Sequence, residues 1–332
     1  MNKKVLTGIK PTGRPHLGNY IGAIKPALSA AQESDKSCYY FIADYHALNS
    51  ITDPKELKLL TYDVAATWLA MGLDPEKVCF YRQSEIPEIF EIQTILTTVT
   101  SKGLMNRAHA YKAAKDKNVE AGKSDLDYGI NMGLYVYPIL MAADILCVNS
   151  DFVPVGKDQV QHVEIARDLA QRFNSMFGEV FKLPSYTLTE SGEVIPGLDG
   201  RKMSKSYDNT IPLFETPKKR RKLVNQIKTT SKEIDDPFPP DECNVFNLFR
   251  HFAQPDHIKE IRESYAKGIS WGAAKEQLNK VLGEVLEEPR EKYLELLANE
   301  KKVDEILSAG AERVRKDASR VLSDAKSAVG IK

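Results

Sequence analysis

Residues 5–19, with the sequence VLTGIKPTGRPHLGN, contain the transition that decides the fold. The stretch begins with a short apolar run typical of a buried strand, which Pro11, Gly13 and Pro15 then interrupt. From Leu17 to about residue 31 the apolar residues recur at helical spacing. A strand, a tight turn and a helix in this order predict the first unit of a parallel sheet with helices packed on it.

The same alternation continues along the chain. Further strands are predicted at residues 38–43, 78–82 and 152–155, and further helices at residues 53–71, 87–99, 102–115, 135–146 and 160–173. This order indicates an α/β protein with a Rossmann-like parallel sheet and helices on both faces. Ligands of such sheets bind at the carboxyl ends of the strands, where the unusual loops of this sequence fall.

After residue 207 the strand signals fade and only helical patterns remain. Helices are predicted from Thr216-Pro217 onward and at residues 246–252, 257–266, 271–286, 290–299 and 303–329. We therefore expect a Rossmann-like catalytic domain at residues 1–207, with a helical insertion at about 100–147. An α-helical domain at residues 208–332 would follow it.

Composition limits the class of protein. The chain has 332 residues, 42% apolar and 28% charged, with a formal net charge of +0, which argues against a uniformly basic nucleic-acid-binding surface. It contains no apolar run long enough to span a membrane and no signal peptide pattern. The four cysteines are far apart, so we expect a reduced, cytoplasmic protein without a disulfide framework or a bound metal.

The first loop of interest is the turn that ends in His16, Gly18 and Asn19. Gly18 allows a backbone or a flat ligand to approach closely, and the start of the following helix offers unpaired N–H groups that suit a phosphate. His16 could donate a hydrogen bond to a phosphate oxygen. The alternative is an ordinary turn with a surface histidine.

The second loop of interest is residues 202–206, with the sequence KMSKS. Lys202 and Lys205 lie three residues apart in a loop that also contains Ser204 and Ser206, and Gly200 precedes it. Two ammonium groups and several N–H donors could surround an anion. The alternative is a solvated basic loop.

Together these two loops resemble the paired signatures of the class I aminoacyl-tRNA synthetases, in the order found in that family. The segments YPILMAADIL (137–146) and VPVGKDQVQH (153–162), and residues 310–313, are similar to the bacterial tryptophanyl-tRNA synthetases. The resemblance extends from Leu6 to about Val329. It implies an enzyme that activates L-tryptophan with Mg²⁺ and ATP, releases pyrophosphate and transfers the amino acid to tRNA(Trp), as a homodimer in the cytoplasm.

The resemblance also implies the residues that contact ATP. Four of them would act in catalysis: Thr12, His16, Lys202 and Lys205. The full ATP-binding set would be Lys10, Pro11, Thr12, Gly18, Asn19, Gly156, Lys157, Asp158, Val194, Lys202, Met203, Ser204, Lys205 and Ser206. Asp158 would hold the ribose, although the same residue could simply cap the following helix.

Asp144 is the expected determinant of the amino acid. It lies in an apolar helical run, where a carboxylate is costly without a partner. It is either a structural aspartate paired with an arginine or a helix N-terminus, or a free acceptor for the indole N–H, as the resemblance implies. A free acceptor would also exclude phenylalanine. The other implied tryptophan contacts are Gly8, His46, Tyr137, Met141 and Gln159, although His46 could equally be a core histidine.

Two residues depart from the resembled family. Lys10 stands where many bacterial members have glutamine, and His16 where many have threonine. The basic run at residues 218–222 could contact tRNA or be a solvated helix face. Competing interpretations are a synthetase for tyrosine or another aromatic amino acid, a nucleotidylyltransferase, which would not need the KMSKS loop, and a non-catalytic RNA-binding paralogue.

Overall fold

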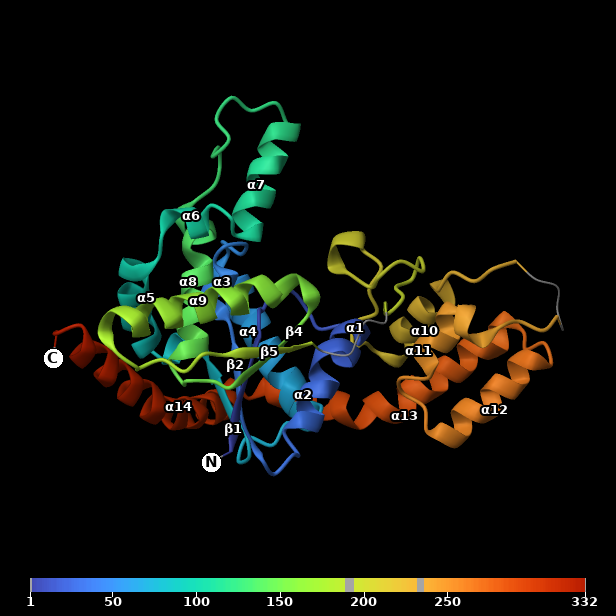
Figure 1. Cartoon of the computed structure of the whole chain (residues 1–332). Coiled ribbons are helices and arrows are strands. Elements are labelled where there is room, and N and C mark those ends of the chain that lie inside the picture. The colour runs from blue at the N-terminus through green and yellow to red at the C-terminus, as the bar shows by residue number, and fades with distance from the viewer. Residues whose placement is uncertain (1, 189–193, 232–235, 332) are drawn as a thin grey trace.

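The computed structural model describes residues 2–188, 194–231 and 236–331, and a five-stranded parallel sheet forms its centre (Figure 1). The strands are β1 (Lys3–Ile9), β2 (Lys36–Ile42), β3 (Cys79–Arg82), β4 (Phe152–Val155) and β5 (Ser185–Leu188). Their order is β3-β2-β1-β4-β5, so the winding direction changes between β1 and β4. Strand β1 pairs with β2 along its whole length but with β4 only at Val5 and Phe152. A ligand crevice is expected at such a switch point.

Helices cover both faces of this sheet, which confirms the predicted fold class. They are α1 (Leu17–Asn19), α2 (Lys25–Ala30), α3 (Asp44–Ala47), α4 (Pro54–Ala70), α5 (Glu88–Val99), α6 (Lys102–Met105), α7 (His109–Glu120), α8 (Met132–Leu146) and α9 (Val160–Phe177). Helices α2 and α4 share one apolar core with the sheet, and α5, α8 and α9 share the other. Helix α7 projects away from the sheet (Figure 1).

Several elements differ from the sequence-based expectation. The helix expected from Leu17 widens into a π-helical segment at Tyr20–Ile24, because Pro26 lacks an N–H and its ring would crowd the carbonyl four residues earlier. The helix predicted at residues 102–115 is broken into α6 and α7. Strand β5 was not predicted, because it has only four residues and all of their side chains are exposed.

The remaining helices are α10 (Pro217–Gln226), α11 (Asn244–Phe249), α12 (Pro255–Ala266), α13 (Trp271–Ala298) and α14 (Glu300–Ala328). The Thr216 side chain caps α10, as its position before a proline predicts. Helix α13 continues through Pro289, where the sequence suggested two helices. Helices α10, α11, α12 and most of α13 enclose a further apolar core, to which Leu17 and Ile21 after the first loop and Met203 of the KMSKS loop also belong.

The last helix, α14, returns to the sheet and packs against β3 and α5. Gly310 allows this approach, because a Cβ there would lie 1.9 Å from the carbonyl oxygen of Phe80. One turn later, Arg313 donates to the carbonyls of Glu76 (3.0 Å) and Val78 (2.8 Å). Helix α14 therefore shares an apolar core with the sheet. The domain division at residue 207 stays a prediction. Within the described ranges, no helix combines the length and apolarity needed to cross a membrane.

Replacing Gly310 with alanine should destabilise the protein by about 2–3 kcal/mol, because the added methyl group must push α14 away from β3. Thermal unfolding checks this. Gly272→Ala in α13 is the matched control, because nothing lies within 4 Å of its added Cβ, and its melting temperature should stay unchanged or rise slightly. Equal melting temperatures for the two variants would contradict the packing argument.

Candidate functional site

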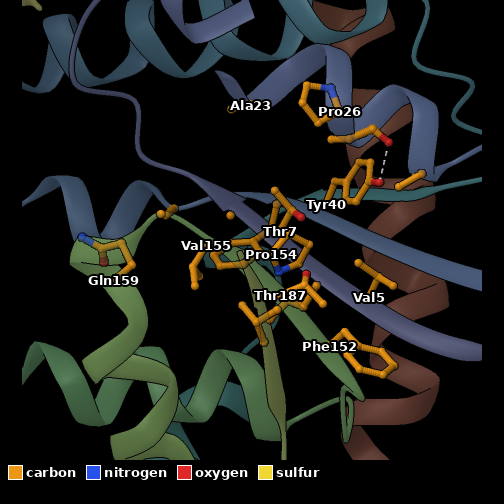
Figure 2. Close-up of a pocket in the computed structure, with 18 of the residues that line it drawn as sticks. Val5, Thr7, Ala23, Pro26, Tyr40, Phe152, Pro154, Val155, Gln159 and Thr187 are labelled. Atoms are coloured by element: carbon orange, nitrogen blue, oxygen red, sulfur yellow. Dashed lines mark hydrogen bonds between the residues drawn. The ribbon is translucent and has the colours of Figure 1, made fainter. Parts of the chain in front are cut away.

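A cavity of about 1390 Å³ opens at the switch point between β1 and β4. Figure 2 shows part of its wall, with Thr7 from β1, Pro154 from β4 and Thr187 from β5 side by side. Pro26 lies on the opposite side and Gln159 at the start of the α9 segment. The sheet therefore places the cavity where open α/β folds bind their ligands.

All six residues expected to contact the amino acid line this cavity: Gly8, His46, Tyr137, Met141, Asp144 and Gln159. Three of them come from one face of α8, because residues 137, 141 and 144 are spaced by four and three positions. From the ATP-binding set, Lys10 and Gly156 line the same cavity. The cavity thus contains the whole predicted amino-acid set and reaches the ATP-binding set at these two residues.

Asp144 is buried, with 1% of its surface exposed, and it is not unpaired. His46 Nε2 lies 2.9 Å from its Oδ2, and Gln83 Nε2 donates to Oδ1 (2.8 Å) and Oδ2 (3.0 Å). The partner of Asp144 is therefore neither an arginine nor a helix N-terminus. The expectation of an unpaired acceptor is also wrong, because both oxygens already have partners. Burial raises the pKa of Asp144, and the hydrogen bonds from His46 and Gln83 oppose that rise. A carboxylate has about four acceptor positions, so one more donor can still bind.

Gln83 is a site residue that sequence reasoning missed. It is fully buried at the start of the 3₁₀ turn Gln83–Glu85, directly after β3. Its Oε1 accepts from the backbone N–H of Tyr45 (3.2 Å), so its amide group must point its N–H toward Asp144. The signal that could have found it is a polar residue at the carboxyl end of a strand next to the expected crevice.

Tyr137 contacts His162 across the α8–α9 interface through its hydroxyl and the ring Nε2. Burial raises the pKa of Tyr137 to about 12 and lowers the pKa of His162 to about 4, the latter helped by the charge of His109. Both groups are therefore neutral at pH 7. The Tyr137 ring is fixed at the cavity wall with a neutral hydrogen-bond partner behind it.

His16 is buried at the N-terminus of α1. Its Nδ1 accepts from the Asn19 backbone N–H (3.3 Å), while Asn19 Oδ1 accepts from the His16 backbone N–H (3.1 Å). Burial and the charge of Lys205 lower the pKa of His16 to about 4, so the ring is neutral at pH 7. With Nδ1 acting as the acceptor, Nε2 carries the proton and is the donor available to a ligand.

The KMSKS loop is docked against the first loop. Lys205 Nζ donates to the Gly13 carbonyl (2.7 Å), and the Gly18 backbone N–H points at Met203 Sδ (3.3 Å). Residues 211–213, just after the KMSKS loop, add backbone hydrogen bonds to Pro15 and Leu17. Two segments about 190 residues apart in sequence (205 against 13) therefore form one surface.

The shape of the KMSKS loop depends on Asn209, a second residue that the sequence did not reveal. Asn209 is buried; its Oδ1 accepts from the Ser204 N–H (2.8 Å) and its Nδ2 donates to the Lys202 carbonyl (3.1 Å) and to Asp199 (2.7 Å). Gly197 permits this, since a Cβ there would lie 2.4 Å from the Asn209 amide. The side chains of Lys202 and Lys205 are left on the outside of a fixed turn.

The other predicted ATP contacts lie outside the residues that line the cavity. Besides Lys202 and Lys205, those exposed to solvent are Thr12, Lys157, Asp158, Val194 and Ser206. Pro11 and Met203 are buried, the latter in the apolar core beneath the loop. Asp158 does not cap α9, because Gln159 occupies that position without a side-chain bond, so the capping alternative is wrong.

The arrangement has a defined chemical capacity. Cationic and N–H donors of the two loops can bind a polyanion, and the apolar cavity beside them ends at a buried carboxylate that still accepts one donor. Among the described residues, no group of three His, Cys, Asp or Glu side chains could hold a metal ion. The cationic and N–H donors of the two loops offer a reaction positioning and charge stabilisation.

Comparisons with known proteins agree with this geometry. The family model "tRNA synthetases class I (W and Y)" matches residues 2–287. The tryptophan–tRNA ligase of Neisseria meningitidis is 53% identical over 99% of this chain and 98% of its own length, and that of Pseudomonas aeruginosa is 50% identical over 100% and 75%. The tryptophanyl-tRNA synthetase of Campylobacter jejuni, solved with ADP and tryptophan, has a TM-score of 0.89 and 42% identity over 98% and 99% of the two chains.

The lowered pKa of His16 makes folding stability depend on pH. The unfolded chain takes up a proton on this histidine near pH 6.5 but the folded chain only near pH 4, so stability is lost as pH falls between these values. His16→Asn keeps a helix-capping acceptor and removes the titration. Between pH 7 and pH 5, the free energy of unfolding measured by denaturant should fall by about 2 kcal/mol less in the variant than in wild type, because about 1.5 pH units lie below the unfolded pKa. An equal fall in the two proteins would show that His16 titrates normally.

Proposed function

The chain belongs to the bacterial class I tryptophanyl-tRNA synthetases, and we propose that it joins L-tryptophan to tRNA(Trp) in two steps at the cavity between β1 and β4. The observation that carries this proposal is the buried Asp144 carboxylate at the wall of an apolar cavity beside the two docked loops. Asp144 offers an acceptor for an indole N–H; because a carboxylate would also accept a phenolic O–H, the choice of tryptophan over tyrosine rests on the relatives and on the shape of the cavity.

In the first step the tryptophan carboxylate attacks the α-phosphate of Mg-ATP, tryptophanyl-adenylate forms and pyrophosphate leaves. Mg²⁺ enters with ATP as part of the substrate and is held mainly by the phosphate oxygens. His16 Nε2–H, the Asn19 region, Lys202 and Lys205 bind the phosphates and stabilise charge on the leaving pyrophosphate. Lys205 exchanges the Gly13 carbonyl for a phosphate oxygen, because an ammonium group binds an anion more strongly than a neutral carbonyl.

The amino-acid end of the substrate lies along α8. Asp144 accepts the indole N–H, His46 and Gln83 hold Asp144 in place, and Tyr137 and Gln159 face the amino and carboxylate groups. Because Asp144 already has two partners, phenylalanine loses one hydrogen bond to a charged group, about 2 kcal/mol, rather than stranding a bare carboxylate. Selectivity against tyrosine comes from the shape of the cavity.

In the second step a hydroxyl of the terminal adenosine of tRNA attacks the adenylate carbonyl, and AMP leaves. The helical region beyond residue 207 binds the anticodon end. Of the basic run in α10, Arg220 is buried beside Glu287 and Arg221 pairs with Glu276, so Lys218 and Lys222 are the better candidates for phosphate contacts. Free cysteines support a cytoplasmic location.

A homodimer is part of the proposal. Large apolar side chains are exposed on and after α7, in the segment that projects from the body: Val119, Leu126, Tyr128 and Met132. A second copy of the chain that covers them would remove this surface from water. Light scattering of the purified protein should give twice the chain mass.

The test of the proposed function is ATP–pyrophosphate exchange with each of the twenty amino acids in turn. Tryptophan alone should support exchange. Exchange with tyrosine would identify the related synthetase instead, and exchange without any amino acid would favour a nucleotidylyltransferase.

Lys205→Ala should slow exchange about a hundredfold or more, because a charge-stabilising donor at such a site contributes about 3 kcal/mol to the transition state. Tryptophan binding, measured by fluorescence titration, should change little. The exposed Lys301 of α14 provides the control, and Lys301→Ala should keep wild-type rates. Parallel losses of exchange and tryptophan affinity in Lys205→Ala would contradict the assigned role.

Asp144→Asn should raise the KM for tryptophan at least tenfold, because it replaces a charged acceptor in contact with the ligand and disturbs its bonds to His46 and Gln83. The KM for ATP should remain close to wild type. If ATP binding collapsed together with tryptophan use, Asp144 would be a structural residue only.

A further inference from the structure

A second buried carboxylate, Asp63 of α4, lies behind the two phosphate-binding loops. Only 3% of its surface is exposed. Its Oδ1 accepts from the Tyr293 hydroxyl of α13 (2.7 Å), but its Oδ2 has no hydrogen-bond donor among the described residues. A carboxylate buried in this way is costly unless a nearby positive charge offsets the loss of water.

The cations near Asp63 belong to the two loops. Arg14 Nε lies 3.7 Å from Asp63 Oδ2, and the Arg14 side chain is 66% exposed, so it contributes little to the packed core. The charges of Asp63 and Lys205 also interact. Burial raises the pKa of Asp63, and Lys205 opposes that rise. Burial lowers the pKa of Lys205, and Asp63 opposes that fall. Lys205 meanwhile donates to the carbonyl of Gly13, the neighbour of Arg14.

We propose that Asp63 is a positioning residue for the activation step. Its carboxylate draws Arg14 and Lys205 toward α4, so the first loop and the KMSKS loop are already together before Mg-ATP arrives. ATP then binds a preformed cationic surface and spends less binding free energy on ordering the loops. This inference rests on the proposed function for the meaning of the step, but it concerns only the binding of the nucleotide.

The Tyr293 bond gives Asp63 a fixed position relative to the helical region. Tyr293 belongs to α13, which packs against α4 on one side and against α10 and α11 on the other. A small cavity of about 20 Å³ between Arg14, Asp63 and Thr67 leaves the guanidinium room to approach Oδ2. One carboxylate oxygen of Asp63 is therefore bonded to α13, and the other faces Arg14 of the first loop.

A purely structural role for Asp63 makes a different prediction. If the carboxylate served only as the acceptor for Tyr293, its replacement would lower stability and affect both substrates alike. The positioning role instead predicts that replacing Asp63 weakens nucleotide binding alone. Replacing Arg14 should have the same effect.

The first experiment compares wild type with Asp63→Asn, which keeps an acceptor oxygen for Tyr293 and removes the charge. Calorimetric titration with Mg-ATP should show affinity lowered about tenfold, the scale of one charge coupling. Tryptophan affinity should be unchanged. Glu300→Gln is the matched control, because it also removes an acid that contacts α4, through exposed Lys58, but at a distance from the loops. Its affinity for Mg-ATP should equal that of wild type.

The second experiment uses Arg14→Gln, whose exposed side chain can be changed without a risk to folding. It should lower Mg-ATP affinity as well, and the double variant with Asp63→Asn should bind no more weakly than the worse single variant. Unchanged affinity in Arg14→Gln, additive losses, or an equal loss of tryptophan affinity would overturn the proposal. Because nucleotide binding is measured without an amino acid, failure of the tryptophan exchange assay would count against the proposed function and not against the role of Asp63.

Discussion

The structure depends on the contact between two loops that lie about 190 residues apart. Lys205 reaches the Gly13 carbonyl, Met203 lies against the Gly18 N–H, and residues 211–213 add backbone bonds to the first loop. The sheet supplies the first loop at the end of β1, and the helical region holds the second through a shared apolar core. Without this contact, the donors that we propose to bind a triphosphate would face solvent separately, and the ligand would have to order them.

Burial and neighbouring groups determine the protonation of His16 and the orientation of Asp144. His16 stays neutral because burial and Lys205 disfavour its protonation, so it remains a donor through Nε2 without adding a further positive charge. Asp144 is held by His46 and Gln83, which fix the direction of its remaining acceptor position before a ligand arrives. In both cases a side chain that we propose to contact the substrate is oriented by neighbours, and these neighbours carry weak sequence signals.

The sequence predicted the parallel sheet, a site at the carboxyl ends of its strands and the two loops, because strand and helix periodicity are local and the KMSKS loop is a contiguous motif. It also grouped Tyr137, Met141 and Asp144, whose spacing places them on one helix face. It did not reveal Gln83 or Asn209, because Gln83 bonds to Tyr45 and Asp144, which are distant in sequence, and Asn209 bonds to residues 199–204 of a neighbouring turn. It missed β5, an edge strand of only four residues whose side chains are all exposed, and it could not show that α14 returns to β3.

The measurement that tests the account most directly is an active-site titration without tRNA, in which purified protein is mixed with labelled Mg-ATP and one amino acid. If the cavity beside the docked loops forms tryptophanyl-adenylate, ATP should be consumed in a rapid burst of about one molecule per active site with tryptophan, and no burst should occur with tyrosine or phenylalanine. A stoichiometric burst with tyrosine, or none with tryptophan, would contradict the central claim.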